Sequence, residues 1–172
     1  MKYFSGFCLT GEQSLFEEVL KPSEYTIAGF SYGAILAFEE AFTCKDRIDT
    51  LQLISPAFFQ DKETKFKKLQ TLHFAKNPEA YKETFVRNVV YPASCDLSSF
   101  VCEGTLEELS TLLHYEWDTQ RLQQLVDRGI EIEVYFGAHD KIIDAKSARE
   151  FFVPYATVYY DKHAGHILKE SI

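Results

Sequence analysis

The sequence YTIAGFSYGAILAFEEA, residues 25–41, decides the fold of this protein. Its first four residues are β-prone, and its last eight are good helix formers. The five residues between them, Gly29-Phe30-Ser31-Tyr32-Gly33, follow the pattern G-x-S-x-G. Where a strand turns sharply into a helix at this pattern, the serine is held in strained geometry with its hydroxyl exposed, and a Cβ atom at either glycine position would clash with neighbouring backbone. Ser31 is therefore the candidate nucleophile, and the N-terminus of the following helix favours the negative charge that develops during its attack.

Further strands are predicted on both sides of this turn. The candidates are the β-prone or alternating runs Lys2–Phe4, Thr50–Ile54, Ile130–Phe136 and Thr157–Tyr160. Helices fit between them at residues 13–20 and 145–152. Strands that alternate with helices predict an α/β domain with about five parallel strands flanked by helices. A chain of 172 residues suggests one domain, residues 1–172.

The segment from residue 58 to residue 128 interrupts this alternation, because it reads mainly helical and lies between two strands. Parallel α/β sheets bind ligands at the carboxyl ends of their strands. Insertions at that edge usually carry function, so we interpret residues 58–128 as a helical lid. The alternative is a helical layer that only covers the sheet.

A serine nucleophile needs a base, and the base needs a carboxylate that orients it. His166 directly follows Gly165 after the last predicted strand, and we favour it over His163 as the base. Asp140 lies immediately after the alternating strand at residues 130–136, so the order along the chain is serine, aspartate, histidine. Asp144 is the alternative acid, although it fits better as the N-cap of the helix that begins near residue 145.

The oxyanion that forms during acyl transfer needs two hydrogen-bond donors. One is expected to be the backbone N–H of Tyr32, the residue after the nucleophile, and the other lies in the loop after the first strand, where we choose Phe7. Cys8 in the same loop is a conceivable nucleophile, but no partner pattern accompanies it, and we interpret it as a buried thiol.

Composition excludes several other classes of function. The formal charge of −8 disfavours nucleic-acid binding. The sequence contains no run of 18 apolar residues, so no membrane span is indicated. Its first residues show no charged segment followed by a long apolar stretch, so we expect no secretory leader. The four cysteines have no metal-type spacing, so we expect reduced thiols in a cytoplasmic protein without a metal. We find no phosphate-binding glycine loop and expect no cofactor.

Charge is distributed unevenly along the lid segment. Between Lys62 and Arg87 there are seven basic residues and three acidic ones, on a chain that is acidic overall. A locally basic helix suggests a docking face for an acidic partner. A solvated helix face without a partner explains the pattern equally well.

Together these motifs resemble the α/β-hydrolase superfamily along most of the chain. Within it, the sequence is most similar to the short form of the pimeloyl-[acyl-carrier protein] methyl ester esterases of biotin synthesis. The family's G-x-x-D before the catalytic acid matches Gly137-Ala138-His139-Asp140, and its terminal G-H matches Gly165-His166. Its H-G-W oxyanion loop is replaced by Ser5-Gly6-Phe7, which alters the side chains and preserves the backbone role. The chain also lacks the early strands of an ordinary member, so the resemblance implies a reduced α/β-hydrolase fold.

The resemblance implies a specific reaction. Ser31 attacks the methyl ester of a pimeloyl chain carried on acyl carrier protein, methanol leaves, and water releases the acid. The lid residues that match the family's acyl-contacting helix are Phe85, Val86, Arg87, Asn88 and Val89. Acyl carrier proteins are acidic, so the implied docking residues are Lys65, Lys68, Lys82 and Arg87. Two alternatives remain: a general carboxylesterase or thioesterase that acts on small acyl esters, and a non-catalytic binding domain with a hydrolase fold.

Overall fold

The computed structural model describes residues 1–171, and its centre is a five-stranded sheet. The strands are β1 (Lys2–Phe4), β2 (Thr26–Phe30), β3 (Thr50–Ile54), β4 (Glu131–Gly137) and β5 (Thr157–Asp161). They pair in chain order, and every pair is parallel. The predicted fold class is therefore confirmed. Phe30 pairs with Ile54, and Ile54 pairs with Tyr135, so the residues that follow β2, β3 and β4 emerge at one edge of the sheet.

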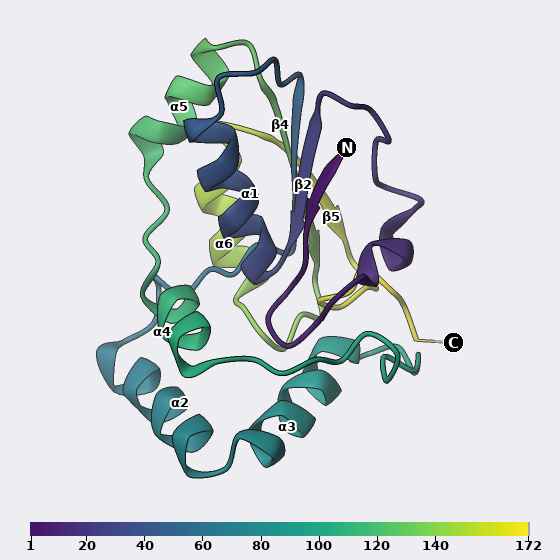
Figure 1. Ribbon diagram of the computed structural model, residues 1–172, viewed down its shortest axis with the longest axis vertical. Coiled ribbons are helices and arrows are strands. Elements are labelled where there is room, and N and C mark those ends of the chain that lie inside the picture. Colours follow the sequence, from purple (N-terminus) through teal and green to yellow (C-terminus); the bar gives the residue numbers. More distant parts are fainter. Residues whose placement is uncertain (172) are drawn as a thin grey trace.

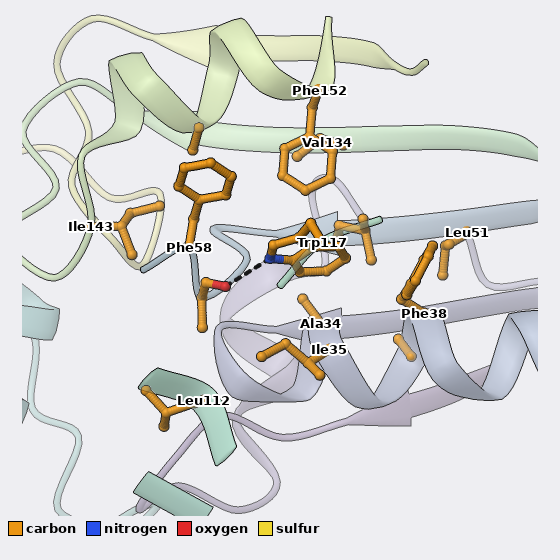
Figure 2. Packing of buried hydrophobic residues seen from close by; sticks show 14 of the residues in the cluster. Ala34, Ile35, Phe38, Leu51, Phe58, Leu112, Trp117, Val134, Ile143 and Phe152 are labelled. Atoms are coloured by element: carbon orange, nitrogen blue, oxygen red, sulfur yellow. Dashed lines mark hydrogen bonds between the residues drawn. The ribbon is translucent and has the colours of Figure 1, made fainter. Parts of the chain in front are cut away.

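Three helices cover one face of this sheet (Figure 1): α1 (Tyr32–Thr43), α5 (Thr119–Asp127) and α6 (Ala145–Phe152). The main hydrophobic core lies between them and the strands. Phe38 of α1 and Phe152 of α6 both pack on Trp117, which precedes α5 (Figure 2). The indole N–H of Trp117 donates to the carbonyl of Ala57 at 2.9 Å, so the buried polar atom of this side chain is satisfied.

The opposite face of the sheet has a thinner cover. The helix predicted at residues 13–20 is instead a short 3₁₀ helix, η1 (Glu12–Phe16), followed by an irregular segment. Gln52 of β3 explains the difference, because its amide accepts from the N–H of Lys21 at 2.8 Å and donates to the carbonyl of Val19 at 2.9 Å. These bonds hold the segment after η1 against the sheet, in competition with a continued helix.

Three consecutive helices follow β3 in the sequence: α2 (Thr64–Lys76), α3 (Pro78–Val90) and α4 (Leu106–His114). Figure 1 shows them beyond the carboxyl ends of the strands, which is where a lid is expected. The last helix of the predicted lid segment, α5, lies elsewhere, because it packs against α1 and β4. Within the described part of the chain, no helix combines the length and apolar character needed to cross a membrane.

Candidate active site

The turn between β2 and α1 has the geometry of a nucleophile elbow. β2 is completely buried and ends at Phe30, and Ser31 then adopts φ 54° and ψ −114°, which is uncommon for a residue other than glycine. The N–H of Ser31 donates to the carbonyl of Ile54 at 2.9 Å, so the strained residue is tied to the neighbouring strand. A Cβ atom at Gly33 would overlap the carbonyl oxygen of Phe4, and one at Gly29 would overlap that of Gly33. The motif glycines therefore allow the backbone of β1, β2 and α1 to meet behind the serine.

Asp140 and His166 are joined by a short hydrogen bond at the same edge of the sheet. His166 Nδ1 lies 2.6 Å from Asp140 Oδ2, and both side chains are fully buried. The other carboxylate oxygen of Asp140 accepts from the N–H groups of Ile142 and Ile143, at 2.7 and 3.1 Å. The carboxylate is therefore fixed by the loop after β4, and it orients the imidazole.

The alternative acid and base lie elsewhere. Asp144 is the N-cap of α6 and accepts from the N–H groups of Lys146 and Ser147 at 3.1 and 3.0 Å. The hydrogen bond from Ser147 N–H is the largest of the effects that hold the pKa of the Asp144 carboxyl below its usual value. His163 is exposed, and its backbone N–H donates to Asp161 in the turn after β5.

The second ring nitrogen of His166 is available for chemistry. A proton on Nδ1, donated to Asp140, leaves Nε2 as the basic nitrogen. Within residues 1–171, this Nε2 atom is buried and has no hydrogen-bond partner. The ring packs on Phe30, the residue before the nucleophile, with 5.0 Å between ring centroids. Ser31 itself is only 3% exposed, and it lies at the same edge of the sheet as His166. A serine–histidine bond that is absent in the free protein often forms only when substrate is bound.

The two predicted oxyanion donors are also free to bind an anion. Across the described residues, the backbone N–H groups of Phe7 and Tyr32 donate to no protein acceptor. The loop that carries Phe7 is held by Glu12, a completely buried residue whose Oε1 accepts from the N–H of Gly6 at 2.8 Å and from the hydroxyl of Tyr3 at 3.1 Å. Burial, together with the Glu12 charge, raises the pKa of Tyr3 far above its usual range, so this hydroxyl remains a donor.

Sequence reasoning missed Glu12 and one further residue, Ser55. An acidic residue in a loop is normally exposed, and a serine before proline indicates only the end of a strand, so neither position carries a local signal of its role. Ser55 is completely buried, and its hydroxyl donates to the backbone carbonyl of His166 at 2.6 Å.

The cysteine of the oxyanion loop has the environment of an unreactive thiol. Cys8 is buried, and burial is the main reason that its pKa is raised to about 12. A thiol with so high a pKa is protonated at neutral pH and is a poor nucleophile.

A cavity of about 530 Å³ lies between the lid helices and the loop after β4. Phe85 and Asn88 line it, with Phe59, Phe66 and Leu112 among the apolar residues and His73 and Lys141 among the polar ones. The ring of Phe85 packs edge-on against Phe7 at 5.4 Å, which places the cavity beside the oxyanion loop.

The other predicted acyl-contacting residues lie outside this cavity. Val86 and Arg87 line a separate groove on α3, and Val89 is buried in the cluster that packs on Phe30. Only part of the Phe85–Val89 segment therefore reaches the main cavity, because successive residues of a helix point in different directions.

The predicted docking residues differ in their surroundings. Lys65 and Lys68 are exposed on α2, beside the exposed side chains of Leu69 and Leu72. Lys82 is paired within the chain, because its ammonium lies 3.0 Å from Glu79 and 2.8 Å from Glu103. Arg87 is exposed and donates to the hydroxyl of Thr84 at 3.3 Å.

Comparisons with known proteins yield structural matches only. No family model and no curated protein sequence matches the chain. Among solved structures, BioG from Haemophilus influenzae superposes with a TM-score of 0.60 at 11% identity, over 96% of this chain and 87% of that one. E-2-(Acetamidomethylene)succinate hydrolase superposes with a TM-score of 0.57 at 14% identity, over 96% and 84%.

In a third match the chain spans less than two thirds of the length of the other protein. An esterase from Exiguobacterium antarcticum superposes with a TM-score of 0.60 at 12% identity, and the match covers 82% of this chain but 59% of the esterase. At these identities the matches establish the architecture alone. The parallel order of β1 to β5, the elbow after β2 and these superpositions agree, and the chain has the α/β-hydrolase fold in a reduced, five-stranded form.

Proposed function

We propose that this protein is a serine hydrolase that cleaves carboxylic esters, with Ser31 as nucleophile, His166 as base and Asp140 as the orienting acid. One observation carries the proposal: His166 is buried, bound to Asp140 through Nδ1 at 2.6 Å, and its Nε2 atom has no partner among the described residues, at the edge where the strained Ser31 lies. A buried ring nitrogen without a hydrogen-bond partner costs free energy in a folded protein. Such atoms are rare, and a catalytic role is one explanation for them.

The geometry supports acyl transfer in two steps. Ser31 Oγ attacks the ester carbonyl carbon while its proton passes to His166 Nε2, and the N–H groups of Tyr32 and Phe7 stabilise the oxyanion. The carbon–oxygen bond to the alcohol then breaks, and His166 returns the proton to the departing oxygen. Water attacks the acyl-serine with the same base, which releases the acid and regenerates Ser31. Asp140 stays ionised and stabilises the imidazolium in both steps.

For the substrate, we propose the methyl ester of a pimeloyl chain on acyl carrier protein, in biotin synthesis. The overall similarity of the sequence to this family and its short length suggest it, and the structural match to BioG extends over nearly the whole chain. The cavity of about 530 Å³ is of a size typical of ligand sites, and its apolar lining suits an acyl chain. The exposed Lys65 and Lys68 on α2 suit an acidic carrier.

The test compares the wild type with Ser31→Ala on three esters: methyl pimeloyl-acyl carrier protein, free dimethyl pimelate and a small chromogenic ester. We expect the wild type to prefer the carrier-bound ester and to be labelled at Ser31 by a fluorophosphonate. Ser31→Ala should remain folded, lose labelling, and lose kcat by a factor on the order of 10⁶. Residual activity within tenfold of the wild type would exclude Ser31 as the nucleophile.

The same assay separates the alternatives. Equal kcat/KM for free and carrier-bound esters would favour a general carboxylesterase, and cleavage of the carrier thioester would indicate a thioesterase. A folded wild type that neither hydrolyses any ester nor reacts with the fluorophosphonate would favour a binding domain.

A further inference from the structure

Ser55 occupies a central position at the catalytic edge of the sheet. It directly follows β3, which lies between β2, the strand that leads to Ser31, and β4, the strand that leads to Asp140. Its side chain is completely buried, and its hydroxyl donates to the backbone carbonyl of His166 at 2.6 Å. This bond joins residues that are 111 positions apart in the sequence.

The backbone around Ser55 contacts all three parts of the site. The N–H of Ser31 donates to the carbonyl of Ile54 at 2.9 Å, and the N–H of Ala57 donates to the carbonyl of Ser31 at 3.1 Å. The N–H of Ser55 donates to Tyr135 of β4 at 2.9 Å. Residues 54–57 are therefore bonded to the nucleophile, to the strand that carries the acid and, through the Ser55 hydroxyl, to the base.

The backbone of Ser55 is in a conformation that its side chain does not favour. Its φ of 41° lies in the left-handed region, which favours glycine or asparagine. Such a conformation costs free energy and persists where surrounding contacts hold it, often at a functional site. Here the contacts are the bond from the Ser55 N–H to Tyr135 and the bond from its hydroxyl to His166, and glycine would not make the second of them.

His166 is held at two points by different residues. Asp140 binds the ring at Nδ1 and sets its rotation, whereas Ser55 binds the main chain and sets the position of the residue as a whole. The loop is also closed by local bonds, from Leu168 N–H to Gly165 O at 3.1 Å and from Gly165 N–H to Lys169 O at 3.2 Å, and His139 N–H ties it to the loop after β4 by donating to Ala164 O at 2.9 Å. None of these bonds connects the loop to β3, the strand beside the one that leads to Ser31.

We infer that Ser55 is a positioning residue, which fixes the imidazole of His166 at the distance from Ser31 that proton transfer requires. The inference rests on the proposed hydrolase function. Ser55 touches neither substrate nor the transferred proton, so its effect passes through His166. Its loss should therefore lower kcat and leave KM nearly unchanged, because the acyl cavity and the lid do not involve it.

The experiment compares Ser55→Ala and Ser55→Gly with Thr50→Val. Both Ser55 variants lose the hydroxyl, but glycine also relieves the positive φ and should fold at least as stably as alanine. Thr50 is a buried residue at the other end of β3, and its hydroxyl makes no side-chain hydrogen bond within the described chain, so Thr50→Val removes a hydroxyl from the same strand without removing a bond to His166. We expect both Ser55 variants to lose about 10- to 100-fold in kcat, as small misplacements of a catalytic group do. The rate of fluorophosphonate labelling should fall in parallel, and Thr50→Val should leave both rates unchanged.

A second readout does not depend on substrate. We expect the proton between His166 Nδ1 and Asp140 to give a low-field ¹H NMR signal, which should shift or broaden in Ser55→Ala and Ser55→Gly and stay in place in Thr50→Val. Full activity in Ser55→Gly, or an unchanged NMR signal in both folded Ser55 variants, would overturn the inference. If the wild type shows neither hydrolysis nor labelling, the proposed function fails, and the NMR comparison alone still decides whether Ser55 positions His166.

Discussion

At the scale of single residues, the two histidines near the C-terminus differ in burial and in their partners. His166 is completely buried and bonded to Asp140, whereas the side chain of His163, three positions earlier, is exposed. A base that accepts a proton from serine is oriented by a carboxylate, and of these two histidines His166 has such a partner in Asp140.

We therefore expect His166→Ala to reduce kcat on a small chromogenic ester by about as much as Ser31→Ala, because the members of a triad act as one unit. His163→Ala should retain nearly the full rate. Steady-state kinetics on the two purified variants decides the matter, and a larger loss in His163→Ala would show that the base is wrongly chosen.

The two aspartates after β4 allow a similar comparison. Asp140→Asn keeps the size of the side chain but loses the charge that stabilises the imidazolium, so we expect kcat to fall by about 10³- to 10⁴-fold. Asp144→Asn should retain wild-type activity, since Asp144 bonds only to the first turn of α6 and asparagine caps helices well. A greater loss in Asp144→Asn would move the acid to that position.

At the scale of elements, α6 begins where it does because of a local signal. The side chain of Asp144 accepts from two N–H groups of the first turn, and its negative charge lies at the positive end of the helix. Because the pKa of this carboxyl is lowered in the folded protein, its charge stabilises the fold above the unfolded pKa of about 3.9, and this stabilisation is lost as the pH falls through the lower folded value.

Asp144→Ala should therefore lower the free energy of unfolding by about 1 kcal/mol at neutral pH. The difference from the wild type should shrink below about pH 4, where the unfolded chain already binds the proton. Urea titrations at pH 7 and pH 3.5 measure both values, and Asp144→Asn serves as the control that keeps a cap without the charge. A difference that is the same at both pH values would mean that the charge of Asp144 contributes nothing.

At the scale of the whole molecule, charge distinguishes α2, which has four lysines and no acidic residue, from the rest of the chain. The chain carries a formal charge of −8, yet α2 exposes Lys65 and Lys68. Attraction between such a face and an acidic carrier speeds encounter and weakens with salt, because the screening length is about 8 Å at physiological ionic strength. Lys82 contributes little to this attraction, since Glu79 and Glu103 already neutralise it.

Reversal of Lys65 and Lys68 to glutamate should therefore raise KM for methyl pimeloyl-acyl carrier protein and leave hydrolysis of dimethyl pimelate unchanged. The matched control reverses Lys45 and Lys146, which are exposed and lie outside α2, so that the net charge is the same. Measurement of kcat/KM at low and high salt should show the difference narrowing as salt increases. Equal effects of both double variants, or no dependence on salt, would reject α2 as the docking face.

By itself, the sequence determined the features that depend on neighbours a few residues away. The elbow at residues 29–33, the alternating strand near residues 130–136 and the helix that begins after Asp144 all follow from local propensity, glycine positions and capping. The order of these elements along the chain also predicted the parallel sheet, because two parallel strands need a crossover connection between them, and that connection is usually a helix.

Only the tertiary structure decided which distant side chains meet. The bond between Asp140 and His166 spans 26 positions, and the bond between Ser55 and His166 spans 111. Gln52 shortened the predicted helix at residues 13–20 through contacts 31 and 33 positions away, and Glu103 neutralised Lys82 from outside the helix that carries it. Such pairs leave no trace in local sequence, because a buried polar group is stabilised by whichever partner the fold brings within about 3 Å, and that partner is set by how the strands and helices pack.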